Sequence, residues 1–357
     1  MVVYFDVQEM YYLPQYDPIK KQLLSIGVDC VFVLYGFPAD KCVVNKAISD
    51  ICVGAGVRYV ENEAEARKLY LEVKPNWIVL GNEFSGLTEI HKVSKTALIG
   101  HGIGPKSCYY TISEMHPTVR FVEGDYRKQR LENMFKEDCF IDTGYAKLDP
   151  VINGDLGTVS LLDWGLDPNK KTLLYAPTFY PSSIEKFPVD FPKDYSEYNI
   201  IIKPHYFSLS NHKYKAQKKR LDGWGAAPNV YMAGVNELSL LPFMAAADVM
   251  ISDASSALFE FAALNKPVVW CDFYQLRWGY RGLLSFRFNK RMDKDLYEYA
   301  DIAIHSPSYK SLKEAVDSQI ENPKEYENNR LSAIENLAGK IDGKSSERIA
   351  KYLHEHA

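Results

Sequence analysis

Two histidines stand within three residues of the end of a short apolar run, at points where a strand would end. His101 follows the run Ala97–Ile99, and Gly102 follows it. An imidazole is the side chain best suited to accept a proton near neutral pH, and a glycine lets a ligand approach the backbone closely. The sequence therefore predicts a proton acceptor at His101, with an ordinary loop histidine as the alternative interpretation.

The second histidine belongs to the segment Lys203-Pro204-His205, which follows the apolar run Ile200–Ile202. A cation and an imidazole that flank a rigid proline could both face an anion at the end of a strand. The alternative is a strand terminus with ordinary solvated polar groups.

A third strand, Val249–Ile251, runs through small and hydroxyl residues into a helical pattern, Ala257–Leu264. The first turn of a helix has unpaired N–H groups and a partial positive charge, which together favour a phosphate. Glu260, one turn inside that helix, could accept hydrogen bonds from ribose hydroxyls. The alternative is a helix that Asp253 or Ser255 caps without any ligand. The predicted phosphate-binding residues of the turn are Ser252, Asp253, Ser255 and Ser256.

The fourth strand, Leu173–Tyr175, enters a proline-bounded loop at a predicted domain junction. Thr178 and Tyr180 lie in this loop, which continues to Pro192 and is rich in aromatic residues. A mobile lid or a contact with the acceptor is one interpretation. A surface loop that folds on its own aromatic side chains is the other.

Strands and helices alternate along the chain, which predicts parallel sheets covered on both faces. A stretch rich in turn residues, Pro150–Lys171, separates two such halves. The predicted helices include Pro18–Ser25, Asp40–Gly54, Glu63–Leu71, Ser311–Ile320, Tyr326–Leu337 and Ser345–Tyr352. The remaining predicted strands are Val2–Phe5, Cys30–Tyr35, Val57–Val60, Trp77–Leu80, Val119–Val122, Cys139–Ile141, Val230–Met232 and Val268–Trp270.

Length and charge limit the classes of function. The 357 residues suggest two domains, and a net charge of −4 argues against a global grip on nucleic acid. The six cysteines form no C-x-x-C pair and are expected to be reduced core thiols, and no metal site is predicted. The sequence shows neither a signal pattern nor an apolar run long enough to span a membrane. The basic run His212–Arg220 predicts a solvated helix face or, alternatively, a contact with anionic lipid or a polyanionic acceptor.

These segments together resemble the CDP-glycerol glycerophosphotransferase family, whose members prime and polymerise teichoic acids and related capsule polymers. The resemblance covers roughly residues 95–285. The motifs that carry it are His101-Gly102, Thr143-Gly144-Tyr145-Ala146-Lys147-Leu148-Asp149, Tyr175-Ala176-Pro177-Thr178, Lys203-Pro204-His205, Ile251-Ser252-Asp253-Ala254-Ser255-Ser256 with Phe259-Glu260, Lys266-Pro267, and Arg281-Gly282.

The resemblance implies an α/β protein of the GT-B fold, in which two Rossmann-like doubly wound domains face a central cleft. The expected boundaries are an N-terminal acceptor domain over 1–155, a linker over 156–171 and a C-terminal donor domain over 172–340. A C-terminal helix over 341–357 could pack back on the N-terminal domain.

The resemblance also implies a reaction. His101 would remove the proton of an acceptor hydroxyl, whose oxygen attacks the β-phosphorus of a CDP-activated alcohol, so that CMP leaves. His205 would contact the donor phosphates, Ser255 and Ser256 would hold the diphosphate, and Gly102, Lys203 and Arg281 complete the expected phosphate-binding set. No cofactor is expected besides the donor itself.

The implied partners are a nucleotide-activated donor and a lipid-linked or oligosaccharide acceptor, with no nucleic acid. The implied location is the cytoplasm, with peripheral contact at the inner face of the membrane. This chain has Ala146-Lys147 where the family usually has Pro-Arg, which leaves open whether the alcohol is glycerol or another polyol. Two alternatives keep the same fold. One is a glycosyltransferase or epimerase that uses a nucleotide sugar, and the other is a non-catalytic nucleotide-binding module.

Overall fold

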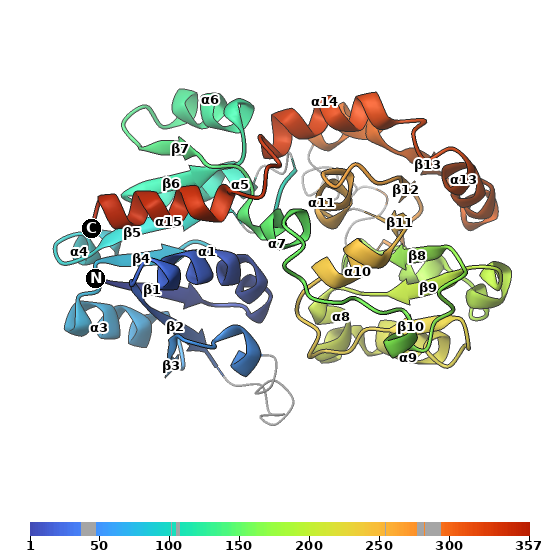
Figure 1. Cartoon of the computed structure of the whole chain (residues 1–357), viewed down its shortest axis with the longest axis horizontal. Coiled ribbons are helices and arrows are strands. Elements are labelled where there is room, and N and C mark those ends of the chain that lie inside the picture. The colour runs from blue at the N-terminus through green and yellow to red at the C-terminus, as the bar shows by residue number, and fades with distance from the viewer. Residues whose placement is uncertain (37–47, 101, 105–107, 254, 277–281, 283–293) are drawn as a thin grey trace. The chain divides into compact units, whose positions relative to one another are not determined.

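The computed structural model describes residues 1–36, 48–100, 102–104, 108–253, 255–276, 282 and 294–357 (Figure 1). The chain divides into two compact units. Unit 1 consists of Met1–Ile103, Ser107–Asn153 and Glu335–Ala357, and unit 2 consists of Gly104–Lys106 and Gly154–Ile334. The change of unit at Asn153 lies close to the predicted domain end at residue 155, and the return to unit 1 falls within helix α14 (Glu327–Ala338).

Unit 1 is a seven-stranded parallel sheet with the order β3-β2-β1-β4-β5-β6-β7. The strand order reverses between β1 and β4, as it does in doubly wound sheets. The strands are β1 (Val2–Val7), β2 (Asp29–Tyr35), β3 (Gly56–Val60), β4 (Trp77–Leu80), β5 (Lys95–Ile99), β6 (Val119–Val122) and β7 (Phe140–Asp142). The helices are α1 (Leu13–Ser25), α3 (Glu63–Val73), α4 (Leu87–Ile90), α5 (Cys108–Thr111), α6 (Asp125–Met134), α7 (Asp149–Ile152) and α15 (Ser345–Glu355).

Unit 2 is a six-stranded sheet with the order β10-β9-β8-β11-β12-β13, and all its named strand pairs are parallel. Its order reverses between β8 and β11. The strands are β8 (Thr172–Tyr175), β9 (Asn199–Ile202), β10 (Val230–Met232), β11 (Val249–Ser252), β12 (Val268–Cys271) and β13 (Ile304–Ser306). The helices include α8 (Tyr206–Ser210), α9 (Lys215–Trp224), α10 (Leu241–Ala246), α11 (Ala257–Ala262) and α13 (Tyr309–Glu321).

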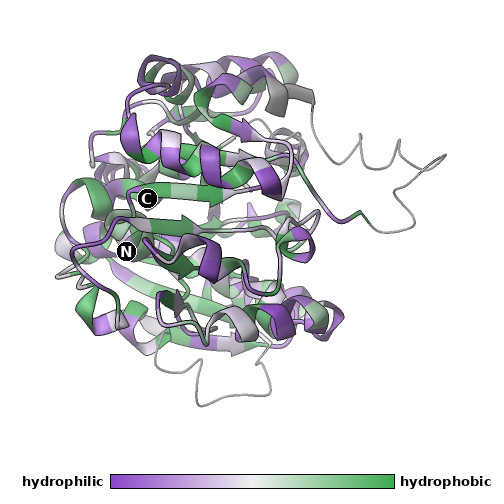
Figure 2. Ribbon diagram, turned by 90° about the vertical axis from the view of Figure 1, so that its right-hand side faces the viewer, coloured by the Kyte–Doolittle hydropathy of each residue, from purple (hydrophilic) through white to green (hydrophobic). Residues whose placement is uncertain are grey.

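The central strands are buried on both faces, which explains why they are continuous apolar runs. All four residues of β4 are buried, and so are all four of β8 and of β11. Figure 2 shows hydrophobic residues concentrated in the strands, whereas hydrophilic residues cover the outer helices. Every strand predicted from an apolar run is present, and the α/β class with two Rossmann-like units is confirmed. The predicted helix Asp40–Gly54 lies largely outside the described residues.

The segment predicted as a linker packs on unit 2. Trp164, in a short 3-10 helix, stacks on Tyr231 with ring centroids 5.2 Å apart, and Phe243 lies 5.0 Å from the same ring. Leu166 is buried, and the backbone N–H of Asp167 donates to the side chain of Asn199. Residues 156–171 are therefore part of the second structural unit.

The C-terminal helix α15 is an integral part of unit 1, where Figure 1 shows it running along the sheet. The indole N–H of the buried Trp77 donates to the carbonyl of Leu353 at 2.9 Å. The carboxylate of Asp149 accepts 2.6 Å hydrogen bonds from both the backbone N–H and the hydroxyl of Ser346. These bonds satisfy buried polar groups on both sides and so fix the position of the helix.

A contact between two glycines sets how closely the chain before α15 approaches the end of β6. A Cβ atom on Gly339 would lie 2.8 Å from the Cα atom of Gly124, and both residues have a positive φ angle. No other residue type fits at either position without moving the backbone, because the clashing atoms are main-chain atoms.

We predict that Gly339→Ala lowers the free energy of unfolding by about 2–4 kcal/mol, since it adds a backbone clash to the strain of a left-handed residue. Gly165→Ala is the matched control. Gly165 has a φ angle of +70° with nothing within 4 Å of the added methyl group, so only the strain of about 1 kcal/mol applies. Urea unfolding measures both variants, and equal losses would contradict the role assigned to the contact.

Candidate functional site

The carboxyl ends of three adjacent strands, β9, β8 and β11, bring the predicted donor-binding residues of unit 2 to one edge of its sheet. The chain after β8 and the chain after β11 leave the sheet on either side of the point where the strand order reverses. This point is where open α/β sheets bind ligands. The segments that follow the three strands contain Lys203 and His205, Thr178, and Ser252 to Ser256.

Backbone hydrogen bonds hold these segments in register. The N–H of Lys203 donates to the carbonyl of Tyr175 at 2.9 Å, and the N–H of His205 donates to that of Pro177 at 3.2 Å. The hydroxyl of Ser252, which is fully buried, donates to the carbonyl of Ala176 at 2.7 Å. The loop after β8 is thus bonded to the segments that follow both neighbouring strands.

Asp253 is the polar centre of this edge. Its side chain is fully buried, and its Oδ1 accepts a 2.7 Å hydrogen bond from the backbone N–H of Thr178. Its Oδ2 accepts hydrogen bonds from the backbone N–H of Ser183 at 2.9 Å and from the Ser183 hydroxyl at 2.8 Å. Because burial disfavours the charged form, it raises the pKa of Asp253 to about 6, although the three donors oppose the shift.

The Ser183 hydroxyl links Asp253 to the core. The Ser183 hydroxyl also lies 2.9 Å from the hydroxyl of Tyr175. Because the Ser183 hydroxyl donates its hydrogen to Asp253, the Tyr175 hydroxyl is the donor in the bond between these two hydroxyls. Asp253 was predicted as a phosphate-binding residue. The structure shows that both its oxygens accept hydrogen bonds from the loop Thr178–Ser183, and that the Ser252 hydroxyl donates to the backbone carbonyl of Ala176.

His205 caps the short helix α8. Its Nδ1 accepts a hydrogen bond from the backbone N–H of Phe207 at 3.2 Å. An acceptor Nδ1 fixes the neutral ring in the tautomer that carries its hydrogen on Nε2. The rings of Phe179 and Phe207 lie 4.6 and 5.0 Å from the imidazole, centroid to centroid, and orient it. The ring hydrogen of His205 is therefore on Nε2, and both His205 and Lys203 are half-buried.

Ser255 and Ser256 lie in the turn that enters α11, and both are partly exposed. The Ser255 hydroxyl accepts a 3.2 Å hydrogen bond from the backbone N–H of Ala257, the first residue of the helix. Glu260 is 1% exposed on the same helix. The N-cap residue itself is Ser256, whose side chain makes no capping hydrogen bond, so neither Asp253 nor Ser255 is the N-cap residue of this helix.

The aromatic residues after Tyr180 form part of the core. Phe187 and Phe191 are each 1% exposed, and Phe187 stacks on Tyr175 with centroids 4.6 Å apart. Thr178 and Tyr180 are also buried. The interpretation of this segment as a mobile lid is therefore wrong, because its apolar side chains are already covered by the sheet and by α9.

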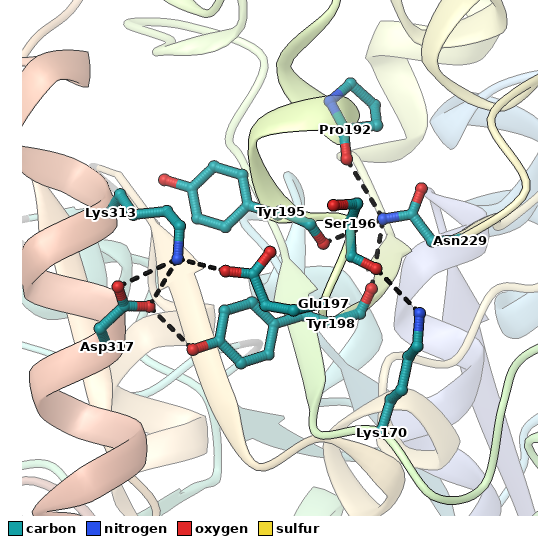
Figure 3. Close-up of polar contacts among 9 residues, drawn as sticks. All are labelled: Lys170, Pro192, Tyr195, Ser196, Glu197, Tyr198, Asn229, Lys313 and Asp317. Atoms are coloured by element: carbon teal, nitrogen blue, oxygen red, sulfur yellow. Dashed lines mark hydrogen bonds and ion pairs between the residues drawn. The ribbon is translucent and has the colours of Figure 1, made fainter.

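Polar contacts fix the end of the same segment (Figure 3). The side-chain amide of Asn229 donates to the carbonyls of Pro192, Tyr195 and Tyr198 at 3.1–3.2 Å. The ammonium of Lys313 pairs with Asp317 at 2.9 Å and also with Glu197. These contacts attach the segment to strand β10 and helix α13, so it moves with the sheet.

Two of the predicted site residues lie outside the described part of the chain, and a third lies in unit 1. His101 and Arg281 lie outside the described residues. Gly102 is described and buried in unit 1. Ser183 and Phe179 hold Asp253 and His205 in place but were not predicted as site residues, because neither has a sequence signal apart from its position after a strand.

The basic run lies on the surface of unit 2. Lys213, Lys215 and Lys219 are exposed, whereas the guanidinium of Arg220 donates to the backbone carbonyls of Glu185 and Phe187. Among the described residues, no helix combines the length and the apolar character needed to cross a bilayer.

The protein has two Rossmann-like units, and polar side chains follow adjacent strands at the switch point of unit 2. This architecture is that of the GT-B class of proteins. Comparisons with known proteins specify the class further. The family model of CDP-glycerol:poly(glycerophosphate) glycerophosphotransferase matches residues 115–355, well over half of the chain. The chain therefore belongs to this family, as the sequence motifs predicted.

A curated relative is the teichoic acid glycerol-phosphate primase of Bacillus subtilis (strain 168), which is 26% identical over 195 residues. The match covers 52% of this chain and 43% of that protein, so the chain spans less than half the length of this relative. Among solved structures, the wall teichoic acid polymerase TagF aligns with a TM-score of 0.65 at 15% identity, over 99% of this chain and 88% of that one. The UDP-GlcNAc 2-epimerase of Neisseria meningitidis aligns with a TM-score of 0.63 at 14% identity, over 99% and 100% of the two chains. Both likenesses establish the fold.

We predict that Asp253→Asn destabilises the protein by about 2–3 kcal/mol, because the new amide directs its own N–H donors at the N–H and O–H donors of a buried site. Ser183→Ala removes one of the three donors and should cost about 1 kcal/mol. Urea unfolding of both variants is the measurement. If the Asp253→Asn protein were as stable as the parent, the carboxylate would not be the group that organises this edge.

Proposed function

We propose that this protein transfers a glycerol phosphate group from CDP-glycerol to a hydroxyl of a growing cell-wall polymer and releases CMP. The observation that carries the proposal is the edge of unit 2 at its switch point, where Lys203, His205 and the Ser255 turn follow adjacent strands, in a chain of the glycerophosphotransferase family.

The residues of this edge fall into two groups, those that bind the phosphates and those that position them. The Nε2–H of His205, the ammonium of Lys203 and the hydroxyls of Ser255 and Ser256 donate to the diphosphate of the donor and stabilise the charge that develops on the leaving CMP. Asp253 and Ser252 are positioning residues, because their polar atoms hold the loop and the strands that carry these donors.

The proton of the acceptor hydroxyl goes to His101 in this proposal. The acceptor oxygen then forms a bond to the β-phosphorus, the bond from that phosphorus to the bridging oxygen breaks, and CMP leaves as an anion. Glu260 and Arg281 complete the proposed donor site, Glu260 through the ribose hydroxyls and Arg281 through the phosphates.

The test uses the purified full chain with CDP-glycerol and a glycerol-phosphate-terminated acceptor, and it measures CMP release and product mass. His101→Ala should lower transfer by roughly 10²–10⁴-fold and leave the affinity for CDP-glycerol nearly unchanged, as expected of a general base. His205→Ala should weaken donor binding and transfer together.

His212→Ala is the control, because His212 is an exposed histidine of the same unit. Equal loss of binding and transfer in His101→Ala would contradict the assignment of the base. Release of UDP or GDP from a nucleotide sugar, or conversion of UDP-GlcNAc, would overturn the proposed reaction.

We also propose that the acceptor is lipid-linked and that the exposed lysines Lys213, Lys215 and Lys219 contact anionic lipid at the inner face of the membrane. Their replacement by glutamine should weaken binding to phosphatidylglycerol vesicles by about fivefold for each lysine, because each contributes about 1 kcal/mol near such a surface. Vesicle flotation at low and high salt measures the effect.

The matched control changes three exposed lysines of unit 1, Lys68, Lys74 and Lys92, to glutamine, which alters the net charge equally. Equal weakening in both triple variants, or equal binding to neutral vesicles, would exclude a specific contact through the basic run.

A further inference from the structure

A narrow pocket lies at the carboxyl edge of the sheet in unit 1, beside the ends of β5, β6 and β7. It has room for about one water-sized group. Apolar side chains from α1 and α15 form part of its wall. The residues that give it polar character are Gln15, Gly100, Glu123, Thr143 and Lys147.

Glu123 lines the pocket with a buried carboxylate that is 3% exposed. Its Oε2 accepts a 2.8 Å hydrogen bond from Arg127, with which it forms an ion pair. Its Oε1 lies against Gly100, so closely that a Cβ atom there would be 2.4 Å away. Among the described residues, nothing donates a hydrogen bond to Oε1. A glycine at position 100 therefore leaves this oxygen open to the pocket.

Gln15, on the first turns of α1, contributes the second polar group. Its side chain is 3% exposed, and its Nε2 has no hydrogen-bond partner within the part of the chain that the structure describes. A buried amide without a partner is costly, whereas a methionine would occupy the same volume at no such cost. A ligand that accepts from Nε2 explains why a polar residue stands here.

We propose that this pocket binds a hydroxyl group of the polyol acceptor, an inference that rests on the proposed function. A hydroxyl can donate to Glu123 Oε1 and accept from Gln15 Nε2 at once. The carboxylate repels an anion, so a phosphate of the same acceptor stays outside the pocket.

The position in the chain suggests which hydroxyl is bound. Gly100 lies against Glu123 and immediately precedes His101, the residue assigned to remove the proton of the attacking hydroxyl. The pocket thus selects acceptors in which a second hydroxyl neighbours the one that reacts. Gln15 and Glu123 are the specificity-determining residues of this selection.

The test compares two probes, sn-glycerol 3-phosphate and 3-hydroxypropyl phosphate, which lacks the neighbouring hydroxyl. Their binding to the full chain is measured by isothermal titration calorimetry. The parent protein should prefer the glycerol compound by about tenfold, the value of a well-placed hydrogen-bonded hydroxyl. Gln15→Met should abolish the preference and leave the urea midpoint at or above that of the parent, because it removes an unpartnered amide.

Two further variants sharpen the test. Gln15→Glu keeps the shape of the side chain and replaces the donor with a second carboxylate, so it should abolish the preference as well. Gln22→Met, on the partly exposed face of the same helix, is the control and should keep the preference.

Equal binding of both probes by the parent protein, or a preference that Gln15→Met leaves intact, would overturn the proposal and assign the pocket to a structural water. Transfer from CDP-glycerol in the same preparations decides the proposed function separately. If the protein transfers glycerol phosphate but binds both probes equally, the proposed function stands and the pocket is not a hydroxyl-binding site. If it prefers sn-glycerol 3-phosphate in a Gln15-dependent way but transfers nothing, the pocket is a polyol-binding site and the proposed function is wrong.

Discussion

The buried carboxylate of Asp253 is the constraint on which the candidate donor site depends. An ion in an apolar interior needs hydrogen-bond donors around it, and here the loop after β8 supplies all three. The loop must therefore fold back to the end of β11. That return places Pro177 where it can accept from the backbone of His205, so one carboxylate sets the spacing of three strand ends.

The strands were predictable because a parallel strand buried on both faces has a simple sequence pattern, a short apolar run between turns. β4, β6 and β10 have the predicted bounds, and most of the others gain one or two residues. Strand β13 was not predicted, since it lies at the sheet edge and has the mixed sequence Ile304-His305-Ser306. Helix α1 was predicted to begin at Pro18, where a proline usually marks a first turn, yet it begins at Leu13.

Site residues whose position depends on strand order could be predicted, whereas those whose position depends on loop contacts could not. Lys203, His205 and Ser255 follow strands that end at one edge, so their proximity could be inferred from strand order alone. The role of Asp253 could not, because it depends on Ser183, a loop residue 70 positions away. The aromatic loop was misread for a related reason. Phe187 and Phe191 have no periodic pattern, and only the packing of unit 2 shows that they are core residues.

The placement of α15 in unit 1 has a consequence for the order in which the protein forms on the ribosome. Residues 1–153 are synthesised before the main segment of unit 2, but their unit also requires residues 335–357, which follow that segment. Until then the indole of Trp77 lacks its acceptor at Leu353, and the carboxylate of Asp149 lacks Ser346. Unit 1 therefore begins before unit 2 in the chain and is completed only after it, and until then the apolar surface that α15 covers is a natural substrate for a chaperone.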